Sequence, residues 1–232
     1  SCKSMRIALY ISGKVRTLFY KFHKNIELIR DRYPNCDIDV FYSFWDSNDR
    51  SDKINDSWHF LAENYQIPVI DEETINSYFN LHHVKSIGEV EPSKKMNEIM
   101  ESSPFKQKGL SSQYYKMERV VEQYFDDGYD LYFRMRSDIL IHDVPSLHFF
   151  NEDTVAINMN YWYNQPYDGS NCNEMILATK AKHFQKCNQL YRNQNELALL
   201  REQYGEFICG NYFGSLEEVT LKPFDFNYRV VR

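Results

Sequence analysis

The chain has 232 residues, and its 33 acidic against 27 basic residues give a formal net charge of −6. With 43% hydrophobic and 26% charged residues, its composition is that of a globular protein and excludes a disordered chain. The acidic balance also argues against general binding to nucleic acid or to an anionic membrane, which needs a basic excess.

Nothing in the sequence predicts a membrane span or a crosslinked scaffold. The best apolar run, Ile7–Ile11, is far shorter than the roughly 18–20 residues of a spanning helix. Residues 1–5 lack the apolar core of a signal peptide. The five cysteines form no Cys-x-x-Cys pair, so neither a disulfide framework nor a zinc site is indicated. We therefore expect a cytoplasmic domain of the size of a small enzyme.

The N-terminal part of the chain predicts a parallel sheet. Residues 6–12 form a nearly continuous apolar run, which is typical of a strand buried on both faces. Apolar residues recur every three or four positions over 17–33 and predict a helix, which Pro34 ends. A second strand is predicted over 37–43. This order of strand, helix and strand is the βαβ unit of a parallel sheet with a right-handed crossover.

The middle of the chain carries weaker signals. Residues 47–65 are polar and predict a loop with a short helix, and residues 67–70 predict a short third strand. An acidic helix start follows at Asp71. Residues 82–109 show little periodicity and contain two prolines, so we expect a mobile excursion or an active-site lid there (82–110 at its widest).

The C-terminal half returns to regular patterns. A helix is predicted over 111–125, and residues 129–141 carry the longest strand signal in the chain. The remaining predicted elements are a strand at 153–158, helices near 180–191 and 195–208, and a closing strand near 219–222. Since no linker separates two self-sufficient cores, we expect a single α/β domain over residues 1–232.

The strand predicted over 129–141 carries the most informative side chains. Alternation puts Tyr132, Arg134, Arg136 and Asp138 on one of its faces. Two guanidiniums on a central strand carry a heavy desolvation cost unless an anionic group satisfies them. Ligands of open α/β sheets bind beyond the carboxyl ends of the strands, where we expect Asp138 to lie. The alternative is an internal Arg–Asp network that only fixes the strand.

The turn after the first strand, Ser12–Thr17, is a second candidate for binding. A strand that ends in Ser12-Gly13 and leads into a helix offers free backbone N–H groups to a phosphate. Gly13 lets a ligand approach the backbone, and Arg16 provides a bidentate grip. One glycine is far short of a phosphate-loop motif, so a tight turn with a surface arginine is the alternative.

Four motifs occur in order along the chain. They are Ser-Gly-x-x-Arg-Thr after the first strand, Asp-Val-Phe-Tyr-Ser-Phe-Trp-Asp at the end of the second, Gln113-Tyr-Tyr-Lys116 at a helix start, and Tyr-Asp-Leu-x-x-Arg-x-Arg-x-Asp from Tyr129. The series resembles a group of glycosyltransferase-like proteins with a GT-A-type fold, found in bacterial surface-polysaccharide loci and large DNA viruses. The resemblance covers residues 6–46 and 111–141, more loosely 168–175, and gives no support over 47–110.

The resemblance implies a GT-A-like fold, with a Rossmann-type, mostly parallel sheet flanked by helices, that binds a nucleotide-sugar donor. The usual metal motif, Asp-x-Asp, reads Arg136-Ser137-Asp138 here, so only one carboxylate remains. We expect a weakly held Mn²⁺ or Mg²⁺ on Asp138, with an arginine sharing the neutralisation of the leaving diphosphate. The alternative is that Arg16, Arg134 and Arg136 provide part of that neutralisation directly. The residues expected on the donor are Ser12, Gly13, Arg16, Arg134 and Arg136.

A transferase also needs a group that handles the acceptor, which we expect to be a glycan or another hydroxyl compound. For inversion, an Asp or Glu takes the proton of the acceptor hydroxyl, and Asp168 and Glu174 are the candidates. An ordinary polar surface loop is the alternative for both. The leading hypothesis is a glycosyltransferase, and the alternative is a non-catalytic module that only recognises nucleotide or carbohydrate. Another nucleotide-using transferase is less favoured, because no glycine-rich fingerprint follows any strand.

Overall fold

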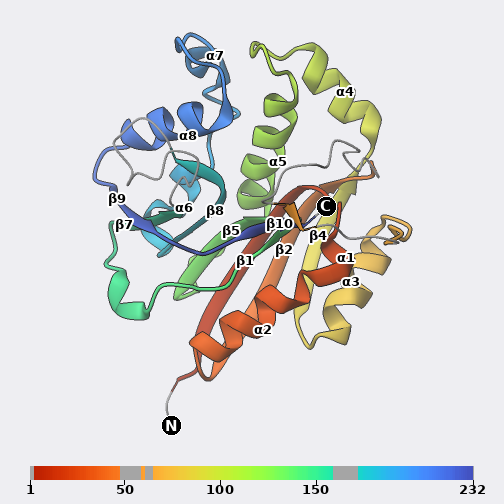
Figure 1. Ribbon diagram of the computed structural model, residues 1–232, viewed down its shortest axis with the longest axis vertical. Helices are drawn as coiled ribbons and strands as arrows, with labels where there is room; N and C mark the ends of the chain where they lie inside the picture. Colours follow the sequence, from red (N-terminus) through yellow and green to blue (C-terminus); the bar gives the residue numbers. More distant parts are fainter. Residues whose placement is uncertain (1–2, 48–58, 61–64, 159–171, 232) are drawn as a thin grey trace.

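The computed structural model of the chain describes residues 3–47, 59–60, 65–158 and 172–231. Its centre is a seven-stranded sheet with the order β4-β2-β1-β5-β8-β7-β9 (Figure 1). The strands of this sheet are β1 (Met5–Lys14), β2 (Cys36–Trp45), β4 (Lys85–Glu91), β5 (Leu131–Arg136), β7 (Thr154–Asn158), β8 (Asn173–Thr179) and β9 (Thr220–Phe224). All of these pair in parallel except β8, which is antiparallel to both of its neighbours. The mixed, mostly parallel sheet in one domain confirms the predicted α/β class.

Helices cover both faces of the sheet (Figure 1). Residues of α2 and α3 belong to the core on one face, and residues of α5, α6 and α8 to the core on the other. The helices are α1 (Leu18–Lys21), α2 (His23–Arg32), α3 (Glu72–Leu81), α4 (Ser93–Glu101), α5 (Gly109–Tyr124), α6 (Ala181–Cys187), α7 (Gln194–Leu197) and α8 (Gly205–Gly214), with a 3-10 turn at Leu147–Phe149. None of the helices in the described ranges has the length and apolar character needed to cross a bilayer.

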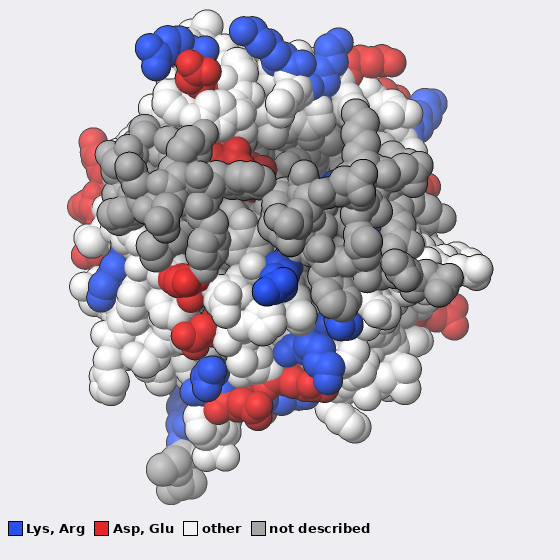
Figure 2. All heavy atoms as spheres, viewed as in Figure 1, with Lys and Arg blue, Asp and Glu red and all other residues white. Residues whose placement is uncertain are grey.

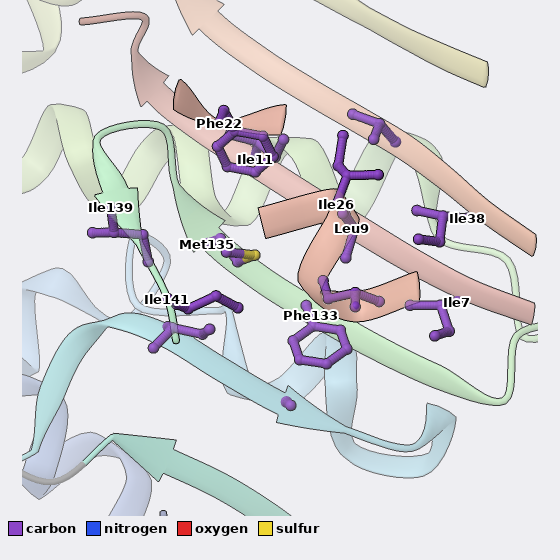
Figure 3. Packing of buried hydrophobic residues seen from close by; sticks show 14 of the residues in the cluster. Ile7, Leu9, Ile11, Phe22, Ile26, Ile38, Phe133, Met135, Ile139 and Ile141 are labelled. Carbon is purple, nitrogen blue, oxygen red and sulfur yellow. The ribbon is translucent and has the colours of Figure 1, made fainter. Parts of the chain in front are cut away.

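The two cores follow from the alternation of side chains along the central strands. Ile7, Leu9 and Ile11 of β1 point into the core on the α2 side, together with Phe133 and Met135 of β5 (Figure 3). The intervening residues of β1 face α5 instead. Both strands are buried on both faces, as near-continuous apolar runs predict for a central parallel strand.

A small second sheet closes the carboxyl end of β5. It has the order β3-β10-β6, formed by β3 (His59–Phe60), β10 (Arg229–Val231) and β6 (Ile139–Leu140). The N–H of Val231 donates to the carbonyl of Asp138 at 2.6 Å, and the carbonyl of Val231 accepts from the hydroxyl of Thr17 at 2.6 Å. The C-terminal strand therefore ties together the two turns that carry Arg16 and Asp138.

Several predicted elements are displaced or divided. The single helix predicted over 17–33 is two helices that meet at Phe22. The predicted strand at 67–70 is wrong, since these residues adopt no regular structure and Val69 is 71% exposed. The helix predicted over 195–208 is likewise two, α7 and α8.

The stretch expected to be an excursion contributes regular structure to the fold. Strand β4 and helix α4 lie within it, so the expectation of an excursion without periodic structure is wrong for 85–101. Strand β4 is an edge strand whose residues are mostly half-buried or exposed, and it lacks the apolar run that marks β1. Strand β8 was not predicted.

The strand predicted over 129–141 ends at Arg136. Residues Ser137 and Asp138 form a turn, after which the chain enters the second sheet as β6. The hydroxyl of Ser137 donates to the carbonyl of Lys14, which fastens this turn to the end of β1. The break matters for function because it places Asp138 beyond the carboxyl edge of the main sheet.

Candidate active site

A cavity of about 340 Å³ lies at the carboxyl ends of β1, β2 and β5. These strands end together because they are parallel and in register: Lys14 pairs with Trp45, and Ser12 pairs with Arg136. The volume is at the lower end of the range of small-molecule sites. The cavity is lined by Ser12, Gly13, Lys14, Arg16, Trp45, Met96, Met100, Gln107, Gly109, Leu110, Ser112, Gln113, Arg136, Ser137, Asp138 and Glu174.

Two guanidiniums share one buried carboxylate on the cavity wall. Asp138, whose side chain is 1% exposed, accepts from Arg16 Nη1 on Oδ2 at 2.8 Å. Arg136 binds the same carboxylate through two bonds, Nε to Oδ1 at 2.9 Å and Nη2 to Oδ2 at 2.7 Å. The arginine side chains keep 23% and 18% of their surface exposed, respectively. The structure thus brings together Ser12, Gly13, Arg16, Arg136 and Asp138 in one cavity, and their binding of a donor or a metal stays a prediction.

The backbone around this cluster adopts uncommon conformations. Gly13 has φ +107°, and Arg16 has φ +45°, in the left-handed region that side chains disfavour. Residues held in such conformations cluster at ligand sites, where surrounding contacts enforce them. Here the bonds of Thr17 to Val231 and of Ser137 to Lys14 supply that support. These contacts hold the turn in the conformation in which the Arg16 side chain reaches Asp138.

One further N–H donor lines the cavity without an acceptor among the described residues. The indole Nε1 of Trp45 is shielded from water and donates to no described atom, whereas the side chain of Gln113, which also lines the cavity, hydrogen-bonds Glu174. Trp45 is 1% exposed, and the ammonium of the buried Lys116 lies 4.2 Å from the centre of its ring. That ammonium is in turn bonded to Ser43 at 2.9 Å and to Glu91 at 2.8 Å. Since buried donors normally find partners, the indole N–H of Trp45 indicates a ligand with acceptor atoms.

Glu174 forms a carboxylate wall of the same cavity. Its carboxyl lies against the first turn of α8, where a Cβ on Gly205 would come within 2.6 Å of Oε2. The thiol of Cys209 lies 3.7 Å from the same oxygen. Burial raises the pKa of Glu174 and the charge of Glu206 adds to this, while Arg136 lowers it. A carboxylate with a raised pKa is a better proton acceptor near neutral pH.

Arg134, which was predicted to bind the donor, does not line this cavity. Its side chain is 1% exposed and donates from Nε to Asn188 at 3.0 Å and from Nη1 to the carbonyl of Glu174. Burial lowers the pKa of its guanidinium, and the nearby Glu174 acts in the opposite direction. Arg134 therefore binds the backbone of the strand that carries Glu174 and lies outside the cavity lining.

Asp168, the other predicted base, lies outside the described residues and stays a prediction. Asp46, at the end of the second motif, accepts from the backbone N–H of Ser93 at 2.8 Å and so satisfies the first N–H of α4. The sequence did not indicate that Trp45 and Gln113 line the cavity with N–H groups, although both lie in motifs quoted above. It also missed Gly205, whose sequence context carries no signal.

The predicted divalent cation does not fit the described residues. Mg²⁺ and Mn²⁺ need several oxygen ligands, and both oxygens of Asp138 accept from guanidiniums. Within the described ranges, no group of three or more His, Cys, Asp or Glu side chains is placed to hold an ion. A cation at Asp138 would also be repelled by two guanidiniums. We therefore derive no chemical step through a metal ion.

Two exposed lysines flank the cavity lining between α4 and α5. Gln107 and Gly109 line the cavity, and the neighbouring Lys106 and Lys108 are exposed. Figure 2 shows Lys and Arg side chains, with Asp and Glu side chains among them, at the upper edge of this face, where Figure 1 places α7 and the connection between α4 and α5. The two lysines give this connection local positive charge even though the chain as a whole is acidic.

Comparison with known proteins finds similar solved structures at low sequence identity. No family model and no curated protein matches the sequence. Among solved structures, the chain is similar to the galactosyltransferase LgtC, with a TM-score of 0.48, 11% identity, and coverage of 90% of this chain and 70% of LgtC. It is also similar to the glycosyltransferase GlyE of Streptococcus pneumoniae TIGR4 (TM-score 0.49, 8% identity, 95% and 45% coverage). A third similar structure is mouse xyloside xylosyltransferase 1 (TM-score 0.47, 8% identity, 96% and 86% coverage). At such low identity, function has to be inferred from the residues of the site.

Proposed function

We propose that the chain is a glycosyltransferase that moves a sugar from a nucleotide-sugar donor to a hydroxyl acceptor such as a glycan. The observation that carries this proposal is the Arg16–Asp138–Arg136 cluster in a cavity at the carboxyl edge of the sheet. In open α/β sheets this edge is where ligands bind, at the point where the strand order reverses. Here the reversal is at β1, with β2 on one side and β5 on the other.

The charge of the cluster suits the diphosphate of such a donor. Two guanidiniums against one carboxylate give the Arg16–Asp138–Arg136 cluster itself one net positive charge. The N-terminal end of α5, through Gly109 and Ser112, faces the same space and adds the positive end of a helix dipole. As the bond between sugar and phosphate breaks, negative charge grows on the diphosphate, and fixed positive groups stabilise it.

The transfer itself needs a proton acceptor, which we assign to Glu174. A bond forms between the acceptor oxygen and the anomeric carbon, and the bond from that carbon to the diphosphate oxygen breaks. Its electron pair stays on the diphosphate, and the proton of the acceptor hydroxyl goes to the carboxylate of Glu174. The raised pKa of this group and its place on the cavity wall support the assignment.

A non-catalytic binding module is the second candidate, and Arg136 favours it. An arginine stands where the Asp-x-Asp motif has its first carboxylate. The same cluster would serve a module that holds a nucleotide without transferring its sugar. Turnover distinguishes the two.

The experiment is a panel of UDP-, GDP- and CMP-sugars tested by thermal shift and by mass spectrometry of the products. At least one donor should raise the melting temperature by linkage and be hydrolysed or transferred. Glu174→Gln should keep donor binding and lose turnover, whereas a module would bind a donor without turning it over. If no donor binds or reacts with or without Mn²⁺, the proposed function is wrong.

A further inference from the structure

We propose that the guanidiniums of Arg16 and Arg136 hold the donor diphosphate in place of a divalent cation, so that donor binding needs no metal. This inference rests on the proposed function and concerns how the same site binds its ligand. In the usual arrangement, carboxylates hold the cation and the cation holds the phosphates. Here the carboxylate of Asp138 holds two guanidiniums instead.

The contacts of Asp138 carry the first step. Three N–H donors converge on its two oxygens at 2.7–2.9 Å, and the residue is 1% exposed. A cation that bound these oxygens would have to displace charge-assisted bonds and then stand beside the displaced guanidiniums. Both costs oppose metal binding.

The remaining surface of the arginines carries the second step. Arg136 is bound to Asp138 through Nε and Nη2, and its side chain also lines the cavity with 18% of its surface exposed. A guanidinium has five N–H donors in a planar fork that matches phosphate oxygens. With its charge fixed and its orientation set by Asp138, it can bind a phosphate without rearrangement.

The other donors of the cavity carry the third step. The indole N–H of Trp45 lines the same space and donates to no described atom, and the amide of Gln113 lies beside it. An N–H donor cannot coordinate a cation, whereas phosphate, ribose and sugar oxygens accept a hydrogen bond from it. The site is thus equipped to bind an anion rich in acceptors directly.

The test is calorimetric titration of UDP, GDP and ADP into the full chain, once in excess EDTA and once with Mn²⁺. At least one nucleotide should bind in EDTA with an affinity within about threefold of that with Mn²⁺, a difference well under 1.4 kcal/mol. Arg136→Gln and Arg16→Gln should each weaken binding in EDTA by about 10- to 100-fold, as expected for a charge-assisted bond.

Arg192→Gln is the matched control. Arg192 is also paired to carboxylates, Glu118 at 2.8 Å and Glu122, but it does not line the cavity. Its replacement should leave nucleotide affinity unchanged. Each cavity variant leaves Asp138 with one guanidinium, so melting curves should report a folded protein.

The outcomes separate this inference from the proposed function. Binding that disappears in EDTA and returns with Mn²⁺ would overturn the inference and leave the glycosyltransferase proposal standing. Binding in EDTA that Arg136→Gln does not weaken would also overturn it. If no nucleotide or nucleotide sugar binds in either buffer, the proposed function itself falls.

Discussion

Asp138→Asn is the substitution that examines the cluster most closely. The asparagine has the same shape but no charge, so the two guanidiniums lose the carboxylate charge that they share. Removing one partner of a buried ion pair costs 3–5 kcal/mol. Because the two arginine side chains keep 23% and 18% of their surface exposed, we expect the lower end, about 3 kcal/mol.

In a chain of 232 residues, 1 kcal/mol corresponds to about 2–4 °C, so the melting temperature should fall by about 6–12 °C. Calorimetry of the protein without ligand, in EDTA, measures this shift. Adding Arg136→Gln to the Asp138→Asn variant removes one surplus charge and should restore part of the stability. A melting temperature within about 2 °C of wild type for Asp138→Asn alone would refute the account of a charge-coupled cluster.

Three further predictions concern separate parts of the fold. Gly205→Ala places a Cβ 2.6 Å from an oxygen of Glu174, and the carboxylate can rotate away from it. The unfolding free energy should therefore change by less than about 1 kcal/mol, while turnover should fall about 100-fold because the proposed base is displaced. Unchanged turnover would contradict the role of Glu174. Trp45→Phe removes the indole N–H, which has no described acceptor, together with part of a buried ring. Nucleotide affinity should therefore fall about tenfold in calorimetry, and the cavity left by the smaller ring should also lower the unliganded stability. The rings of His23 and His82 stack at 4.4 Å, and burial lowers the pKa of both. The folded state therefore binds fewer protons than the unfolded state, so the unfolding free energy is fully retained above about pH 6.5 and falls as the pH drops below that value. Urea titrations between about pH 7 and 5 should show a smaller fall for His82→Phe than for wild type. An equal dependence of the unfolding free energy on pH in the two proteins would contradict this prediction.

The apolar patterning predicted the centre of the fold because burial there is complete. Ile7, Leu9 and Ile11 are all fully buried, and a strand buried on both faces has to be apolar throughout. Alternation along β5 was equally informative, since Phe133 and Met135 do face the core opposite to that of Tyr132. The partly exposed strand at the edge of the sheet has no comparable apolar pattern in its sequence. Strand β4 contains Ile87 at 54% exposure, and its place is decided by pairing with β2.

The candidate site was predictable in composition but not in geometry. The face of β5 that carries Arg134 and Arg136 was correctly predicted, yet only the second reaches the cavity. The reason is the turn at Ser137, which ends the strand just after Arg136 and swings Asp138 back toward it. No periodicity encodes that turn, because it is fixed by contacts with β1 and with the distant C-terminal strand.

The central claim is that the arginines at the carboxyl edge of β1 and β5 hold the diphosphate of a nucleotide-sugar donor. The most direct measurement is a crystal structure of the chain with a nucleoside diphosphate from the binding panel, grown in EDTA. We expect phosphate oxygens within hydrogen-bond distance of the guanidiniums of Arg16 and Arg136, with Asp138 still bound to both. A nucleotide that binds away from this cavity, or whose phosphates do not contact either arginine, would contradict it.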